Sequence, residues 1–248
     1  MEYVLLAVWC FLVAVAGGLV GLVLGNIRLP VVLLLVSSAG AGTGANIGIS
    51  AVAAASASVA HLRAGRVNWR LFAWMAPPSI AGAIAGGYVS GVLPEDILLV
   101  SIAVVLLYSA IEVLRKPAPK PPPDGEHTLD IPAAVASGAV IGLLGGIVGL
   151  ILGSLRIPAL VRLVGEAPAR AVGTNVTIGF CVGVAGVIGH LPSEPPDWGV
   201  LAVGSAASIP GALLGSRLTG KLSDDALLRA IGVVLAIAGV SMLVKALT

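Results

Sequence analysis

Charged residues are scarce in this sequence of 248 residues, where Asp, Glu, Lys and Arg together make up 10%. An ordinary soluble domain carries about 25%. Hydrophobic residues make up 58% of the chain, and the mean hydropathy is +1.06. These values exclude a soluble globular protein and predict an all-α polytopic membrane protein in a lipid bilayer. No basic run with interleaved aromatic residues occurs, so we expect no nucleic-acid partner.

Motifs for covalent, redox or metal chemistry are missing as well. The two cysteines, Cys10 and Cys181, stand in separate apolar segments and form no CxxC pair, so we expect small buried side chains. The chain contains no HExxH or GxSxG motif, and no Gly-Lys-Ser/Thr sequence follows its glycines. We therefore expect neither an enzyme nor a protein that holds a cofactor or a metal ion.

Acidic residues are predicted to avoid the middle of the membrane. Glu112 lies one turn from a helix end, and seven further acidic residues fall in predicted loops: Glu95, Asp96, Glu166, Glu194, Asp197, Asp224 and Asp225. A buried carboxylate relay for protons therefore has no candidate. Coupling would involve protonation of the substrate, a histidine, or no ion at all.

One short sequence occurs twice in the chain. Residues 17–30 read GGLVGLVLGNIRLP and residues 145–158 read GGIVGLILGSLRIP, with nine of fourteen positions identical. Each copy has one arginine, Arg28 or Arg156, inside a long apolar stretch and two residues before a proline. A cation is costly inside a bilayer and is usually kept there for function. Both arginines are therefore candidate site residues.

The duplication extends over the whole chain. Trp69 and Trp198, for example, are equivalent residues 129 positions apart. We predict a first membrane repeat at 1–114 and a second at 131–248. The segment between them, 115–130, is rich in proline, which excludes helix and indicates a linker.

Each repeat is expected to hold an apolar helix, a break, a short apolar segment and three longer helices. The short segment cannot cross a bilayer alone, so we favour a re-entrant, broken-helix hairpin followed by three transmembrane helices. Five crossings in each repeat is the alternative. The expected helical segments are 3–25, 31–39, 43–62, 70–91 and 96–114 in the first repeat, and 133–153, 159–164, 172–190, 199–219 and 225–246 in the second.

The charges of equivalent loops predict that the repeats are inverted. Loop 61–70 is strongly basic, whereas its equivalent, 190–198, has no Lys or Arg. By the positive-inside rule the first loop is cytoplasmic and the second external, and the basic start of the linker is cytoplasmic too. Equivalent loops on opposite sides require inverted-topology repeats.

The Asn/Ser-x-Arg-x-Pro motif at the break predicts an anion site. Proline suits the first turn of a helix, and Asn26 and Ser154 are good capping residues, although they come a residue or two early. A helix N-terminus and a guanidinium both favour sulfite, sulfonate or carboxylate oxygens. In inverted-repeat transporters, broken helices meet near the midplane, so we expect Arg28 and Arg156 to share one site. The alternative is that each arginine binds backbone carbonyls or reaches an interface.

The second break in each repeat adds polar side chains to this hypothesis. It reads AGTGAN at 41–46 and VGTNVT at 172–177. These residues would donate hydrogen bonds to the same anion, and helix capping explains them equally well. They are Thr43, Asn46, Thr174 and Asn175.

Three short motifs recur in both repeats: one at the first break, one at the second break, and Asn/Asp-Trp before the next helix. They are Arg28-Leu29-Pro30 and Arg156-Ile157-Pro158, Gly42-Thr43 and Ala171-Val172-Gly173-Thr174-Asn175, and Asn68-Trp69 and Asp197-Trp198. This pattern resembles the sulfite exporter TauE/SafE family over nearly the whole chain. The sequence departs from this pattern at two places. Many relatives carry glycines at the break where this chain has other residues, and this chain has AGTGAN where the family has AVGTS. The resemblance implies export of sulfite or small organosulfonates across the bacterial inner membrane.

The residues and the resemblance together predict a secondary transporter. Its partners would be a small anionic substrate and the bilayer, and a homo-oligomer is compatible with the sequence. The anion would bind near the midplane, between paired arginines and half-helix N-termini, and cross by alternating access. An anion channel, or a carrier of another small anion such as a carboxylate, is the alternative.

Overall fold

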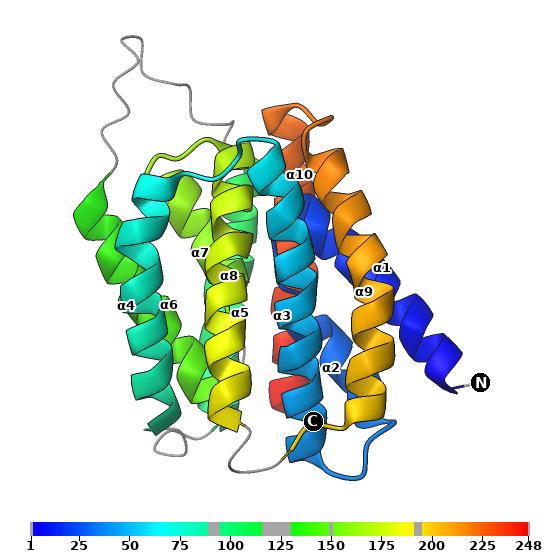
Figure 1. Ribbon diagram of the computed structural model, residues 1–248. Coiled ribbons are helices and arrows are strands. Elements are labelled where there is room, and N and C mark those ends of the chain that lie inside the picture. Colours follow the sequence, from blue (N-terminus) through cyan, green and yellow to red (C-terminus); the bar gives the residue numbers. More distant parts are fainter. Residues whose placement is uncertain (1, 89–94, 116–129, 149–150, 191–194, 248) are drawn as a thin grey trace.

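The computed structural model describes residues 2–88, 95–115, 130–148, 151–190 and 195–247, and these residues form helices joined by short turns, with no strand among them. The all-α prediction is therefore confirmed (Figure 1). The first repeat holds α1 (Glu2–Val20), α2 (Gly25–Leu33), α3 (Ala39–Arg63), α4 (Trp69–Tyr88) and α5 (Glu95–Arg115). The second holds α6 (Ile131–Val148), α7 (Gly153–Pro158), a π-helical turn η1 (Ala159–Leu163), α8 (Pro168–His190), α9 (Trp198–Thr219) and α10 (Asp224–Leu247). Residues 116–129 of the expected linker lie outside the described residues.

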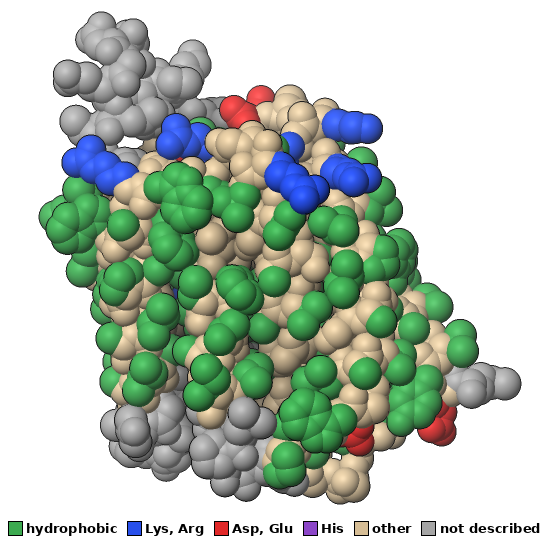
Figure 2. All heavy atoms as spheres, in the orientation of Figure 1, with side chains coloured by type: hydrophobic (Ala, Val, Ile, Leu, Met, Phe, Trp, Pro, Cys, Tyr) green, Lys and Arg blue, Asp and Glu red, His purple; other side chains and the backbone are tan. Residues whose placement is uncertain are grey.

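The described helices have the length and composition of membrane spans. Five of them are long and apolar enough to cross a bilayer: Glu2–Val20, Ala41–Arg63, Pro168–Ile188, Trp198–Thr219 and Asp224–Val244. Their outer faces remain apolar, and Val233, Ile237, Val240 and Val244 of α10 are each more than half exposed. Figure 2 shows hydrophobic side chains over the middle of the molecule and Lys and Arg side chains gathered at one end. This is the surface of a protein surrounded by lipid.

The first helix ends at a glycine in the left-handed conformation. Helix α1 is continuous through Gly17 and Gly18 and stops before Gly21, whose φ is 70°. A Cβ at Gly21 would lie within 3 Å of Val172 of the second repeat, so only glycine fits this turn. The short segment expected at 31–39 therefore begins earlier, as α2 at Gly25.

Helix α1 lies parallel to α9 along its whole length. Gly199 at the start of α9 faces Tyr3, and at the other end Thr219 donates a hydrogen bond of 2.7 Å to the carbonyl oxygen of Leu19. Helix α1 therefore extends as far across the bundle as α9 does. The chain then returns through residues 21–24 and α2, so the broken hairpin has one complete arm and one interrupted arm (Figure 1).

The two repeats exchange their first helices. Helix α1 packs on α9 of the second repeat, and α6 packs in the same way on α4 of the first. Glycines make these approaches close: a Cβ would lie 2.5 Å from the Phe11 carbonyl oxygen at Gly211, and 2.2 Å from the Ser79 carbonyl oxygen at Gly142. Backbone contact at small residues thus joins the repeats at two equivalent interfaces.

Equivalent helices also pair with each other, α3 with α8 and α5 with α10. Figure 1 shows α3 and α8 side by side and running in opposite directions. A pseudo-two-fold axis between the repeats produces both features: each repeat packs its first helix on the other, and equivalent helices pack on each other. The inversion of the repeats across a bilayer stays a prediction, and this arrangement supports it.

Candidate binding site at the two helix breaks

The side chain of Arg28 connects α2 to α3 in the interior of the bundle. It is 1% exposed. Its Nε donates to Asn46 Oδ1 over 2.9 Å, and its Nη2 donates to the Asn46 carbonyl oxygen, also over 2.9 Å, and to Ser50 Oγ. Asn46 Nδ2 in turn donates to the carbonyl oxygen of Gly25 at the start of α2, over 3.1 Å. The arginine therefore lies inside the protein, and one of its hydrogen bonds goes to a backbone carbonyl, as the alternative explanation expected.

The side chain of Arg156 has an equivalent place in the second repeat and is also 1% exposed. Its Nη1 donates to Asn175 Oδ1 over 3.1 Å. Asn175 Nδ2 donates to the carbonyl oxygen of Gly153 at the start of α7, over 3.2 Å, and to that of Gly21 over 2.6 Å. The last bond crosses to the first repeat, so the two helix breaks are linked through one asparagine.

Glycine at the start of each short helix leaves room for the asparagine. A Cβ would lie 3.1 Å from Asn46 Nδ2 at Gly25, and 3.0 Å from Asn175 Nδ2 at Gly153. Both distances are shorter than ordinary van der Waals contact. The repeated glycines of the motif therefore bring each asparagine amide against the backbone at a helix start.

The two arginine sites differ at one position. Ser50 corresponds to Gly179, 129 residues later, so the second repeat lacks the hydroxyl that binds Arg28. Among the described residues, Arg156 Nε is buried without a hydrogen-bond partner. The second guanidinium is thus less completely satisfied than the first.

Neither arginine has an acidic partner in the part of the chain that the structure describes. The contacts of Arg28 and Arg156 are amide, hydroxyl and carbonyl oxygens. The ion pair found between described residues joins Arg170 to Glu166 over 3.5 Å, outside these networks. Both breaks therefore carry positive charge that the surrounding oxygen atoms solvate but do not neutralise.

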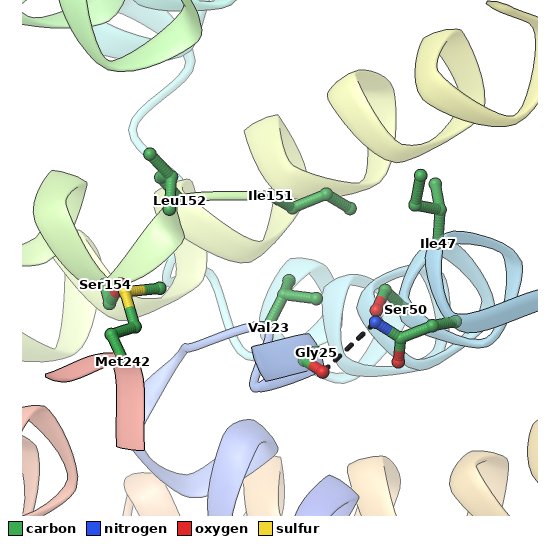
Figure 3. Close-up of a pocket in the computed structure, with 9 residues that line it drawn as sticks. Val23, Gly25, Ile47, Ser50, Ile151, Leu152, Ser154 and Met242 are labelled. Carbon is green, nitrogen blue, oxygen red and sulfur yellow. Dashed lines mark hydrogen bonds between the residues drawn. The ribbon is translucent and has the colours of Figure 1, made fainter. Parts of the chain in front are cut away.

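A small pocket lies between the two breaks (Figure 3). Val23 and Ile151, which are equivalent residues 128 positions apart, both line it. In Figure 3, Ser50 and Gly25 lie on one side of the pocket, and Ser154 and Met242 lie together on another. The full lining is Val23, Gly25, Asn46, Ile47, Ser50, Ile151, Leu152, Ser154 and Met242. The cavity volume is about 10 Å³, room for about one water molecule, so a larger guest requires movement of the walls.

The expected capping by Asn26 and Ser154 is wrong. Helix α2 begins after Leu24 and α7 after Leu152, with no side-chain cap at either start. The prolines do not stand in the first turn either, because Pro30 lies inside α2 and Pro158 ends α7. Both helices begin earlier than predicted, and for α2 the reason is the left-handed glycine that ends α1 at Val20. Ser154 lines the pocket, whereas the side chain of Asn26 lies outside the described residues.

Within the described residues, the two threonines expected at the site, unlike the asparagines, do not bind the arginines. Helix α3 begins at Ala39 with Ser38 as its N-cap, and α8 begins at Pro168, so neither threonine is a cap. Thr174 Oγ1 accepts a hydrogen bond of 2.9 Å from the backbone N–H of Asn68, while Thr43 is half-buried. Among the described bonds, those of the arginines involve Asn46 and Asn175 and neither threonine.

The Asn/Asp-Trp motif has a structural role. Asn68 Oδ1 accepts from the backbone N–H of Leu71 over 3.1 Å, and Asp197 Oδ1 accepts from that of Val200 over 2.9 Å. These side chains are the N-caps of α4 and α9.

Two buried residues that the sequence analysis did not select stand out. Ser50 lies one turn after Asn46, and this i to i+4 spacing was the available signal. Glu166 lies in the loop between η1 and α8, as expected, but is only 1% exposed. Its carboxylate accepts from Asn68 Nδ2 and from the N–H of Ala167. No pattern in the sequence indicated this burial, because Asn68 belongs to the other repeat.

Comparison with known proteins agrees with the motifs. The model of a protein family described as Sulfite exporter TauE/SafE matches residues 6–242, which include both arginine motifs. The "Probable membrane transporter protein YunE" of Bacillus subtilis (strain 168) is 26% identical over 153 residues. That alignment covers 55% of this chain and 55% of the relative, so the chain spans about half the length of the protein it matches. No solved structure matches the chain.

Proposed function

Since the chain belongs to the sulfite exporter TauE/SafE family, we propose that it exports small sulfur oxyanions or organosulfonates as a secondary transporter. Its family and its apolar helices make it a multi-pass membrane transporter. We assign it to the bacterial inner membrane. The anion binds near the midplane, between the two helix breaks, where Arg28 and Arg156 supply positive charge.

Two buried guanidinium groups with uncharged partners carry this proposal. Burial of a cation in a low-dielectric interior is costly unless an opposite charge lies close to it. Each arginine is 1% exposed, and no described carboxylate contacts either one. A small anion between the breaks would lower the electrostatic free energy of both groups.

The exchange of helices between the repeats supports alternating access. Because each repeat packs its first helix on the other, the two halves are structurally equivalent partners around the breaks. Transporters built from such repeats open to one side and then to the other as the halves exchange conformations. The pocket between the breaks has room for about one water molecule, so passage of an anion requires movement of the halves.

The experiment that tests this function is uptake of labelled sulfite and of methanesulfonate into proteoliposomes, with and without the same anion inside. We expect uptake that is faster with internal anion, as counterflow through a carrier requires. Arg28→Gln and Arg156→Gln should each lose uptake, whereas Arg217→Gln, at an exposed basic residue of α9, should retain it. Uptake by wild type that neither arginine variant changes would contradict the site.

The same experiment separates the alternatives. Uptake that internal anion does not stimulate, together with channel-like rates, would indicate a channel. Competition by acetate that equals competition by unlabelled sulfite would indicate a carboxylate carrier.

A further inference from the structure

Among the described residues that line the pocket, Ser50 contributes the hydroxyl that binds Arg28. Arg28 is absent from the residues that line this pocket, whereas both of its partners, Asn46 and Ser50, are part of the lining. The Nη2 atom of Arg28 donates to Ser50 Oγ, so the serine oxygen faces the guanidinium. The positive charge therefore lies directly behind the Ser50 hydroxyl.

The hydrogen of this hydroxyl has lost its usual acceptor. In a membrane helix a serine commonly donates to the carbonyl oxygen four residues earlier, as Ser56 does to Val52 over 2.9 Å and Ser216 does to Ala212 over 2.7 Å. For Ser50 that acceptor is the carbonyl of Asn46, and Arg28 Nη2 already occupies it over 2.9 Å. A carbonyl oxygen has two lone pairs, and the helical N–H takes the other.

With the carbonyl four residues earlier taken, the Ser50 hydroxyl, which accepts from the guanidinium, is able to donate toward the pocket that it lines. Acceptance from a cation also strengthens its own donation, because linked hydrogen bonds polarise one another. Asn46 lines the pocket too. Its Oδ1 accepts from Arg28 and its Nδ2 donates one hydrogen to the Gly25 carbonyl, so the second hydrogen of the amide is a further donor. The lining thus offers donors to an anion and keeps the charge one layer away.

The second repeat does not reproduce this arrangement. Gly179 stands where Ser50 does, and a Cβ there would lie 3.2 Å from Val23 Cγ2. The pocket is therefore asymmetric, although the arginines and asparagines around it are repeated. The hydroxyl donor with a guanidinium behind it lies on the side of the first repeat.

We propose that Ser50 is a specificity-determining residue of the transporter, and that its hydroxyl donates a hydrogen bond to an oxygen of the bound anion. This inference rests on the proposed function. Arg28 is then a positioning residue, which orients the hydroxyl and supplies the charge behind it. The anion lies closer to the first repeat than to the second.

The test compares sulfite uptake into proteoliposomes by wild type, Ser50→Ala, Ser50→Cys and Ser58→Ala. Ser58 is the matched control, because it lies two turns further along α3 and is also buried. We expect Ser50→Ala to raise the half-saturating sulfite concentration by about tenfold, the loss of one hydrogen bond to a charged group. Ser50→Cys keeps the size of the side chain but is a weaker donor, so it should raise the concentration by a smaller factor.

Three outcomes decide the matter. An unchanged half-saturating concentration in Ser50→Ala and Ser50→Cys would overturn the inference and leave the transport function standing. A lower maximal rate and a lower melting temperature at unchanged half-saturation would overturn it too, because Ser50 would then serve only as an acceptor for Arg28. If wild type takes up neither sulfite nor methanesulfonate, the proposed function fails and this inference fails with it.

Discussion

Asn46 and Asn175 make the same two hydrogen bonds in the two repeats. The side-chain oxygen of each accepts from a buried arginine, and the side-chain nitrogen donates to the carbonyl of the glycine that begins the preceding short helix. An asparagine has both a donor and an acceptor at its end, which this position requires. The orientation of each guanidinium thus depends on an amide 18 or 19 residues further along the chain.

Replacement of this amide by a carboxylate should weaken anion binding. Asn46→Asp keeps the shape but neutralises Arg28 and removes the donor to the Gly25 carbonyl. We expect the half-saturating sulfite concentration to rise by at least about tenfold, because the new carboxylate competes with the substrate for the same charge. The measurement is sulfite uptake into proteoliposomes. Asn175→Asp should act in the same direction, and wild-type affinity in both variants would mean that the charge of these arginines does not contribute to anion binding.

The size of the side chain at Met242 should set which anions enter. Met242 lines the small pocket between the breaks and is 3% exposed. Met242→Ala removes a long flexible side chain and should increase competition by larger sulfonates, such as butanesulfonate, against sulfite uptake. Met242→Leu conserves volume and is the control. An inhibition series that is identical in all three proteins would show that this pocket does not select the substrate.

The glycine contacts between α1 and α9 should be intolerant of a methyl group. Gly211→Ala would place its Cβ 2.5 Å from the Phe11 carbonyl oxygen, a backbone atom that cannot move alone. We expect a loss of about 1–3 kcal/mol in stability, read as a lower unfolding temperature in detergent. Gly186→Ala is the comparison, since its Cβ would lie 3.2 Å from a methyl group of Ile47 that can shift. Equal effects of the two changes would contradict the packing that we describe.

The inverted orientation of the repeats predicts which loops a reagent reaches. In a background with Cys10→Ala and Cys181→Ala, we expect Pro195→Cys to react with a membrane-impermeant maleimide in intact cells. Arg63→Cys should react only after the membrane is opened, because the positive-inside rule predicts that the basic α3–α4 loop is cytoplasmic. Both positions are exposed in the structure. Equal reaction of both in intact cells would contradict the inversion.

Much of the fold could be predicted from composition and repetition. An apolar chain in a bilayer must satisfy its backbone within helices, so the scarcity of charge led directly to an all-α membrane protein. The duplicated motif identified Arg28 and Arg156 as buried cations, and the structure buries both. The recurring Asn-Trp and Asp-Trp pairs were recognisable from the chain, but their role as helix N-caps was not.

The chain by itself determined which segments become helices, because hydropathy and helix period are local properties. Tertiary packing decided the rest. Several glycines near the break were equally suited to end α1, and Gly21 does so where the chain turns tightly against Val172 of the other repeat. Ser50 faces the pocket, and Glu166 is buried elsewhere against Asn68. At both places segments from distant parts of the sequence meet. The hydrogen bond between Asn68 and Glu166 forms only after the repeats pack together, which is why no pattern within either repeat indicates it.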